Sequence, residues 1–329
     1  MKTLVGITIG IVLIFSGFVY ASDNYKSKRY AALIFAQDYQ QELITEGRKI
    51  EKSIRKKEKS SSKREKKVER LEKEEAGIGH LEIGPEIYYF RYKEPGVMKE
   101  DGMMYGLTGA YSWHNNFMLK AEGRIAGGQV DYEGSGTIDN ISDFSAEVRG
   151  LGGYDFKPSE EFIITPYFGI GYRYLNDDAS GKISSTNYGG YERESNYIYS
   201  PIGVEGVFNM QDGWSIGGLV EYDIFWQGKQ KSHLSDVRCY DPIAGYYTDN
   251  DVENDQDKGY GIRGSIKLLK KGEKLDFVIE PFIRYWNIKK SKEVATSTIS
   301  ENGLWIKYGT VIEPKNNSTE IGVKFMIGF

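Results

Sequence analysis

The sequence predicts an all-β fold, a ten-stranded antiparallel transmembrane β-barrel preceded by an N-terminal charged helical arm. Three observations support this prediction. Ten segments of the 329-residue chain alternate apolar and polar residues with a period of two, as strands with one apolar and one polar face do. The apolar side of each segment lacks a charge at its centre. The connections between segments are alternately short and long, which is typical of barrels that cross a membrane.

The first stretch, residues 1–21, has the composition of a secretory signal peptide. Lys2 provides the positive charge, residues 5–18 form the apolar core, and residues 19–21 place small or apolar side chains before the cleavage point. An uncleaved anchor helix is the alternative. No later stretch has about eighteen consecutive apolar residues, so no further transmembrane helix is predicted.

Residues 22–78 are predicted to form a basic arm that is helical or partly disordered. Apolar residues recur at roughly helical spacing between 29 and 54, residues 55–67 contain none, and three serines at 60–62 interrupt the pattern. Residues 48–75 hold 13 Lys and Arg against 7 Asp and Glu. We interpret the arm as a solvated periplasmic spacer or as a tether to the cell wall or a partner. Nucleic acid is not a predicted partner, because an exported chain rarely meets it.

The predicted barrel occupies residues 79–329. Each of its segments has about the ten residues that a tilted strand needs to cross a bilayer. The ten segments are 81–92, 102–113, 117–130, 143–156, 162–174, 197–208, 214–227, 259–269, 277–287 and 318–329.

The two faces of these segments differ in charge. A charged side chain that faces lipid near the bilayer centre costs about 2–4 kcal/mol, so ten apolar faces without a central charge favour contact with lipid. The other faces carry acids and bases in nearly equal number, and we expect these to pair in a narrow lumen because an unpaired buried charge is strongly destabilising. The pattern therefore argues against a wide porin. The predicted luminal network is Glu82, Glu86, Lys120, Glu122, Arg124, Glu147, Arg149, Arg173, Glu205, Glu221, Arg263, Glu280 and Arg284.

The chain ends in an alternation that closes on a terminal aromatic residue. Val323, Phe325, Ile327 and Phe329 share one side of the last segment. This ending resembles the last-strand insertion signal of bacterial outer-membrane β-barrels. The resemblance implies recognition by the barrel-insertion machinery of a Gram-negative cell and contact with outer-membrane lipid and lipopolysaccharide. An even number of strands leaves both termini in the periplasm.

Periodicity does not say which face of the barrel is inside, and a soluble barrel would bury its apolar face. The signal peptide, the terminal Phe329 and the aromatic residues that flank the short connections favour the membrane. Two such pairs are Trp113 with Phe117 and Phe208 with Trp214.

The fourth long connection, 228–258, carries an acid at every second position. In an extended chain these acids would point the same way, and a divalent cation would relieve their repulsion. The match to a calcium loop fails, since Asn254 stands where Gly is expected and Tyr260 where Glu is expected. A weak cation site and a solvated acidic loop therefore stay open, and no cofactor is predicted. The acids are Asp249, Asp251, Glu253, Asp255 and Asp257.

The strand count and connection lengths over 81–329, the strand end at 224–226 and the close from Asn316 to Phe329 resemble the omptins, which are outer-membrane proteases. The resemblance implies carboxylates in the second long connection that face an Asp-His pair in the fourth. The sequence departs from this pattern, because the His precedes the Asp and Lys231 stands two residues before the His. The candidate catalytic residues under this alternative are Asp131, Glu133, His233 and Asp236.

The signal peptide, the Gly-rich and Tyr-rich strands and the terminal signal together resemble the opacity-type and porin-like surface antigens. This resemblance implies an outer-membrane surface protein with a structural or interaction role, or a narrow pore of low conductance. An omptin-like protease and an adhesin that acts through long external loops are the alternatives. Under the first interpretation no catalytic residue is expected.

Overall fold

The computed structural model describes residues 44–49, 51–59, 78–243, 245–301 and 306–329. The predicted signal peptide, residues 1–21, lies outside these ranges. The chain divides into two units, Met1–Lys73 and Glu74–Phe329. In the first unit residues 44–49 and 51–59 are helical, and Arg55 binds Glu51 one turn away at 2.9 Å, a spacing that supports a charged helix. No helix among the described residues is both long and apolar enough to cross a bilayer.

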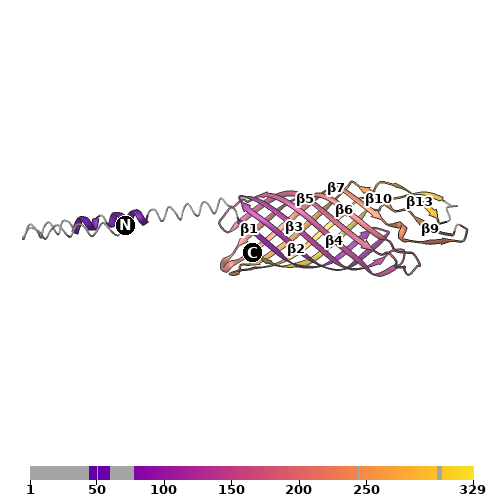
Figure 1. The fold of residues 1–329 in the computed structure, drawn as a ribbon, viewed down its shortest axis with the longest axis horizontal. Coiled ribbons are helices and arrows are strands. Elements are labelled where there is room, and N and C mark those ends of the chain that lie inside the picture. Colours follow the sequence, from indigo (N-terminus) through magenta and orange to yellow (C-terminus); the bar gives the residue numbers. More distant parts are fainter. Residues whose placement is uncertain (1–43, 50, 60–77, 244, 302–305) are drawn as a thin grey trace, which may run out of the picture. The chain divides into compact units, whose positions relative to one another are not determined.

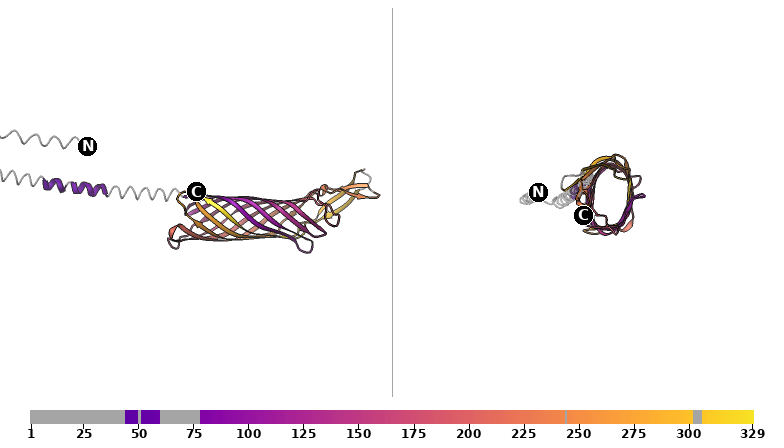
Figure 2. Two further views of the ribbon diagram at one scale, coloured as in Figure 1. Left: turned by 90° about the horizontal axis from the view of Figure 1, so that it is seen from below. Right: turned by 90° about the vertical axis from the view of Figure 1, so that its right-hand side faces the viewer.

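The second unit contains a closed antiparallel barrel of ten strands, which confirms the predicted fold class. Each barrel strand pairs with the next one along the chain, and the last pairs with the first, so the ribbon closes on itself (Figures 1 and 2). The strands are β1 (Ile78–Glu94), β2 (Met98–Asn115), β3 (Phe117–Glu133), β4 (Thr137–Tyr154), β5 (Phe162–Asp178), β6 (Glu192–Asn209), β7 (Trp214–Ser232), β11 (Gly259–Lys270), β12 (Asp276–Ile288) and β15 (Asn316–Gly328).

Side chains alternate between the two faces of the barrel wall, as the period of two predicts. Phe168 and Val220 point outward and are 70% and 67% exposed, whereas their sequence neighbours Tyr167 and Glu221 are buried inside. A barrel in water would show the reverse arrangement, because apolar surface left in water costs about 25 cal/mol per Å². The outer surface is therefore suited to an apolar surrounding.

Aromatic side chains lie at both ends of this apolar surface. At one end Tyr154 packs against Phe117 and Phe156, with ring centroids 5.3 and 4.9 Å apart. At the other end Tyr222 stacks on Tyr260 at 5.9 Å. Rings of aromatic residues mark the interfaces of membrane barrels. We call the exposed apolar residues between them the apolar belt. Its members, one from each strand, include Ile83, Leu107, Ile125, Val148, Phe168, Ile202, Val220, Ile266, Ile279 and Phe325.

The two ends of the barrel differ in their connections. The turn end holds the connections at 116, 155–161, 210–213 and 271–275, and the loop end holds all the others. The predicted long connections 93–101 and 131–142 are in fact turns at 95–97 and 134–136, because the strands continue past the belt. There the outer face is polar as well, so the apolar signal that marks a strand stops while the hydrogen-bonded ladder goes on.

Two of the predicted long connections contain strands of their own. β10 (Val252–Gln256) extends the barrel sheet by pairing with the end of β7. β8 (Cys239–Asp241), β9 (Gly245–Asp249), β13 (Val294–Ser300) and β14 (Ile306–Val311) form a separate four-stranded sheet in the order β14-β13-β9-β8. We call this the external sheet, and it lies beyond the loop end of the barrel (Figure 1).

Candidate functional site

A layer of arginines and carboxylates fills the lumen at the level of the apolar belt. Arg124 on β3 donates to Glu147 at 2.7 Å, to Glu86 at 3.3 Å and to Glu320 at 3.0 Å. Arg284 on β12 donates to Glu320 at 2.8 Å and to Glu86 at 3.0 Å. One cation therefore joins strands on several sides of the barrel, which is possible because its five N–H groups spread in a fork.

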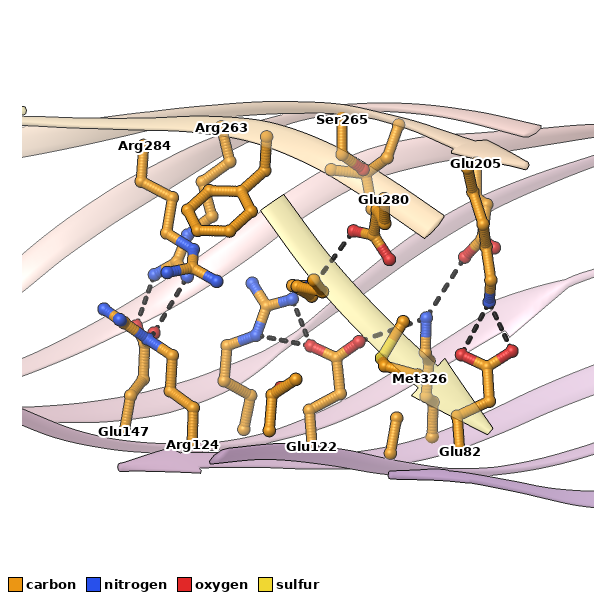
Figure 3. A pocket seen from close by; sticks show the side chains of 18 of the residues that line it. Glu82, Glu122, Arg124, Glu147, Glu205, Arg263, Ser265, Glu280, Arg284 and Met326 are labelled. Carbon is orange, nitrogen blue, oxygen red and sulfur yellow. Dashed lines mark hydrogen bonds and ion pairs between the residues drawn. The ribbon is translucent and has the colours of Figure 1, made fainter. Parts of the chain in front are cut away.

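Further bonds extend this layer across the lumen. Arg263 donates to Asp223 at 2.8 Å, to Glu147 at 3.0 Å and to the Tyr199 hydroxyl at 2.8 Å. Arg173 donates to Glu320 at 2.6 Å. Arg263 and Arg284 reach inward from one wall toward Glu147 and Arg124 on the facing wall (Figure 3).

A second group of ions lies nearer the turn end. Arg149 binds Glu122, with Nε at 2.8 Å, and Glu221. Lys120 lies 3.1 Å from Glu122 and 3.3 Å from Glu205. In the same region Lys267 binds Glu82 at 2.7 Å and Lys324 binds Glu280 at 2.9 Å.

The ions leave little free space. The cavity among them has a volume of about 70 Å³, room for a few water molecules. The arginines of the layer and their acceptors are almost fully buried, yet each is paired, which is the condition under which buried charge is tolerated. Removal of one partner from such a pair costs about 3–5 kcal/mol.

All thirteen residues of the predicted luminal network lie on the inner wall. In the register of β3 and β4, Glu122 is opposite Arg149 and Arg124 is opposite Glu147. Sequence reasoning missed the tyrosines that complete the network, of which Tyr167 donates to Glu221 at 2.7 Å. They stand at the same alternate positions of the strands as the inward charges, and this alternation would have located them. The thirteen are Glu82, Glu86, Lys120, Glu122, Arg124, Glu147, Arg149, Arg173, Glu205, Glu221, Arg263, Glu280 and Arg284.

A separate ion cluster lies at the loop end, above the belt. Arg193 on β6 binds Glu94 at 3.1 Å, Glu100 at 2.7 Å and Asp177 at 2.7 Å. The Tyr92 hydroxyl contacts Glu94 at 3.1 Å and Glu313 at 3.2 Å. Burial, and then the charge of Glu94, raises the pKa of Glu313 to about 7. The apolar alternation stops at residue 174 and resumes at 197, so the sequence predicts a connection over 175–196 and gives no sign of this cluster.

The candidate protease residues have different partners. Asp131 and Glu133 face outward on β3, where Asp131 accepts the Asn140 N–H at 2.8 Å and Glu133 binds Lys99 at 2.7 Å. Asp236 accepts the Glu192 N–H at 3.0 Å. His233 instead lies 2.7 Å from Glu194. Among the described residues, no hydrogen bond or ion pair joins the side chains of these four candidates.

The five alternating acids of the fourth long connection do not converge either. Asp249 accepts the Thr298 hydroxyl and Asp251 accepts the Ser235 hydroxyl, the latter at 2.7 Å. Glu253 on β10 binds Lys229 at 2.6 Å. Asp257, just after β10, lies 3.9 Å from Lys292. β9 belongs to the external sheet and β10 to the barrel sheet, so the five acids do not lie along one continuous strand. Asp255 is exposed on β10.

The predicted insertion signal lies at the turn end. Phe325, Ile327 and Phe329 are exposed on the outer face and Val323 is half-buried there. The Phe329 N–H donates to the Leu81 carbonyl at 2.9 Å, so the last residue is paired with β1.

Comparison with known proteins gives similarity in fold only. No protein family and no curated protein matches the chain. Among solved structures, the chain is similar to the outer membrane protease OmpT from Escherichia coli, with a TM-score of 0.49, 12% identity and coverage of 78% of this chain and 97% of that one. The chain is also similar to the translocator domain of autotransporter NalP from Neisseria meningitidis. The TM-score is 0.34 and the identity 13%, with coverage of 83% of this chain and 97% of that one. For Ail, the attachment invasion locus protein of Yersinia pestis, the TM-score is 0.25 and the identity 12%, with coverage of 75% of this chain and 98% of that one.

An architecture does not by itself specify an activity. The assignment to the class of transmembrane β-barrels rests on the chain's own closed strand pairing, its apolar belt and its charged interior.

Proposed function

We propose that this chain is an integral outer-membrane β-barrel with a closed lumen, which acts as a surface scaffold for interaction and not as an open pore. The proposal rests on the layer of arginines and carboxylates that fills the lumen at the level of the belt. Arg124, Arg284 and Glu320 join β1, β3, β4, β12 and β15 across the lumen. A solute could pass only by breaking several buried ion pairs, and each broken pair is costly.

The external sheet supports the interaction role. Ile243, in the turn between β8 and β9, is 97% exposed, and Tyr308 on β14 is 79% exposed. Exposed aromatic and aliphatic side chains are common in surfaces that bind other proteins. A surface antigen of the opacity type, or an adhesin, would present such a sheet to the outside.

The orientation follows from the proposed location. An even number of strands places both termini in the periplasm, with the turn end facing inward and the external sheet facing outward. Lipid and lipopolysaccharide would contact the belt, and the basic arm would lie in the periplasm within reach of the cell wall. Val323, Phe325, Ile327 and Phe329 would be read by the barrel-insertion machinery.

Single-channel conductance of the refolded barrel in planar bilayers tests the closed lumen. We expect little or no steady conductance from the wild type, and higher conductance or cation preference from the double variant Arg124→Ala, Arg149→Ala. The matched control is Lys229→Ala with Arg238→Ala, which removes two cations outside the lumen. A large, stable wild-type conductance would contradict the closed-lumen proposal.

The level of inserted protein tests the proposed signal. Phe329→Ala should lower the amount of heat-modifiable barrel in the outer membrane and increase periplasmic degradation. Tyr308→Ala, an exposed aromatic change on the external sheet, is the control. Wild-type levels for Phe329→Ala would contradict the insertion role of the C-terminus.

A further inference from the structure

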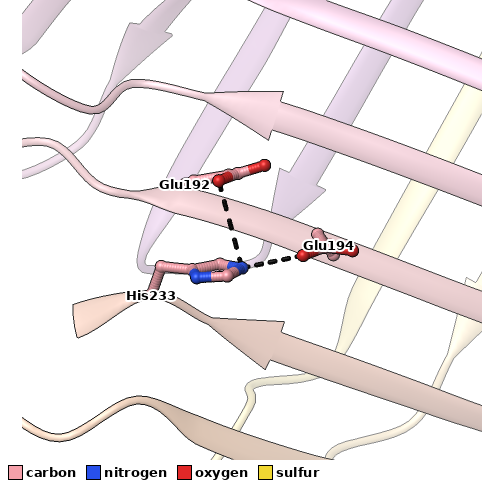
Figure 4. A group of neighbouring side chains, drawn as sticks. All are labelled: Glu192, Glu194 and His233. Atoms are coloured by element: carbon pink, nitrogen blue, oxygen red, sulfur yellow. Dashed lines mark hydrogen bonds and ion pairs between the residues drawn. The ribbon is translucent and has the colours of Figure 1, made fainter. Parts of the chain in front are cut away.

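Three side chains with metal-ligand atoms meet on the outer face of the loop end, apart from the luminal network. Glu192 and Glu194 are two residues apart on β6, so they project from the same face of the strand. His233 directly follows β7, and its N–H donates to the Glu192 carbonyl at 3.0 Å. This bond continues the ladder between β6 and β7 and brings the imidazole beside the two carboxylates (Figure 4).

The distances fit one small ion. His233 Nε2 lies 2.7 Å from Glu194 Oε1 and 4.0 Å from Glu192 Oε2. One donor atom from each residue lies within 4.8 Å of the other two. Nitrogen and oxygen ligands sit about 2.0–2.2 Å from Zn²⁺, so they are roughly 3–4 Å apart around it, and small side-chain rotations would close the set.

Each of the three side chains is also held by a group outside the set. Nδ1 of His233 lies 3.4 Å from Asp251. The Tyr174 hydroxyl donates to Glu194 Oε2 at 3.1 Å, and the Asn176 amide donates to Glu192 Oε1 at 2.6 Å. These contacts use the atoms that face away from the common space and leave His Nε2, Glu194 Oε1 and Glu192 Oε2 turned toward it. Outer contacts of this kind orient the ligands of metal sites, and a carboxylate behind a histidine is a frequent one.

The local charge favours a cation. Glu192, Glu194, Asp236 and Asp251 bring four acidic groups, and Lys231, the register partner of Glu194, brings one positive charge. The side chains are 17%, 25% and 34% exposed for His233, Glu194 and Glu192, which is open enough for an ion to enter from solvent.

We propose that His233, Glu194 and Glu192 bind one Zn²⁺ ion that ties the outer ends of β6 and β7 together. One imidazole nitrogen with two carboxylate oxygens is a donor set that suits zinc, with water in the fourth position. Ca²⁺ prefers six or more oxygen ligands and does not suit an imidazole. This is the one group of three such ligands among the described residues. The imidazole distinguishes it from the solvated acids of β10.

Zinc titration of the refolded full-length chain tests the site. After removal of metal with a chelator, a competition assay with a zinc-binding dye at pH 7.5 should show one Zn²⁺ per chain. We expect His233→Ala and Glu194→Gln to abolish this stoichiometric binding. Asp251→Asn, which alters the group behind the imidazole and its contact with Ser235, should weaken it by about 10–100-fold. The controls are His114→Ala, a histidine at the turn end, and Glu253→Gln, which removes a nearby acid outside the set.

Two readouts distinguish a zinc site from a simple hydrogen-bonded cluster. X-ray absorption of the zinc-loaded barrel should show one imidazole nitrogen and oxygen ligands near 2.0 Å. Binding should also weaken as pH is lowered, because protons compete with zinc for its ligands. Absence of stoichiometric binding, or binding that persists unchanged in His233→Ala, would overturn the proposal.

Discussion

The ion pairs inside the barrel and those on its external segments use the same residue types in different ways. In the lumen the ions are shared, as Glu320 accepts from Arg124, Arg173 and Arg284. On the external segments, the arginine and lysine pairs are exposed and each joins two residues only. Arg238 binds Glu301 with about half of each side chain exposed. The luminal ions therefore replace an apolar core, whereas exposed pairs contribute only about 0–1 kcal/mol each.

The largest expected effect comes from the shared acceptor. Glu320→Ala leaves three arginines without their common partner in a buried site, which should destabilise the barrel by about 3–5 kcal/mol or prevent its closure. Urea unfolding of the refolded barrel in lipid vesicles, followed by heat-modifiability on gels, measures this. Glu301→Ala removes an exposed acid and serves as the control. Equal stability of the two variants would erase the distinction between the regions.

A lysine introduced on the outer surface should have different effects in the apolar belt and on the external sheet. Val220→Lys places an ammonium group in the middle of the belt and should cost about 2–4 kcal/mol. Tyr308→Lys places the same ammonium group on the external sheet and should cost little. The comparison is made by unfolding in vesicles. A tolerated lysine at 220 would argue that this surface does not face lipid.

The loop-end cluster should respond to pH. The carboxyl of Glu313 has a pKa of about 7 when docked against Glu94, Arg193 and Tyr92, above its usual value of 4.5. Because the docked state holds the proton more tightly, docking loses stability as pH rises from 4.5 through 7. Corrected amide exchange at Ser291 and Glu313, which hydrogen-bond to each other, should therefore be faster at pH 8 than at pH 5.

Glu313→Gln is the control for that measurement, since the amide cannot ionise. It should remove the pH dependence and leave exchange slow at both values. Exchange in the wild type that does not change with pH would show that Glu313 is ionised without penalty.

The smallest expected effect is that of an exposed pair. Arg238→Ala removes the Glu301 partner and the contact with the Tyr246 ring, 4.0 Å from the guanidinium carbon to the ring centre. Unfolding should change by less than about 1 kcal/mol. A loss comparable to that of Glu320→Ala would show that the external sheet contributes to barrel stability.

The sequence predicted the barrel well where lipid restricts the choice of residue. Val220 and Phe168 were placed outward because a charge is excluded there, and Glu122 and Arg149 were placed inward on adjacent strands. The partners across the lumen could not be predicted, since the contact of Arg124 with Glu86 and Glu320 depends on barrel closure and register.

Prediction failed above the belt, where both faces of a strand meet water. Arg193 continues β6 with a side chain that is only 12% exposed, but its neighbours Glu192 and Glu194 are polar too, so the alternation has no visible contrast. The external strands are only three to seven residues long, as β8 and β13 illustrate, which is too short for a reliable periodic signal. The neighbours of His233 were missed for the same reason.

The pairing of β15 with β1 also bears on the order of events during biogenesis. Glu320 on β15 accepts from arginines on β3, β5 and β12. Until β15 has paired, those guanidinium groups have no complete set of acceptors and the lumen cannot exclude water. The interior therefore cannot be sealed in stages, and zipping of β15 onto β1 and β12 becomes the step that dehydrates it.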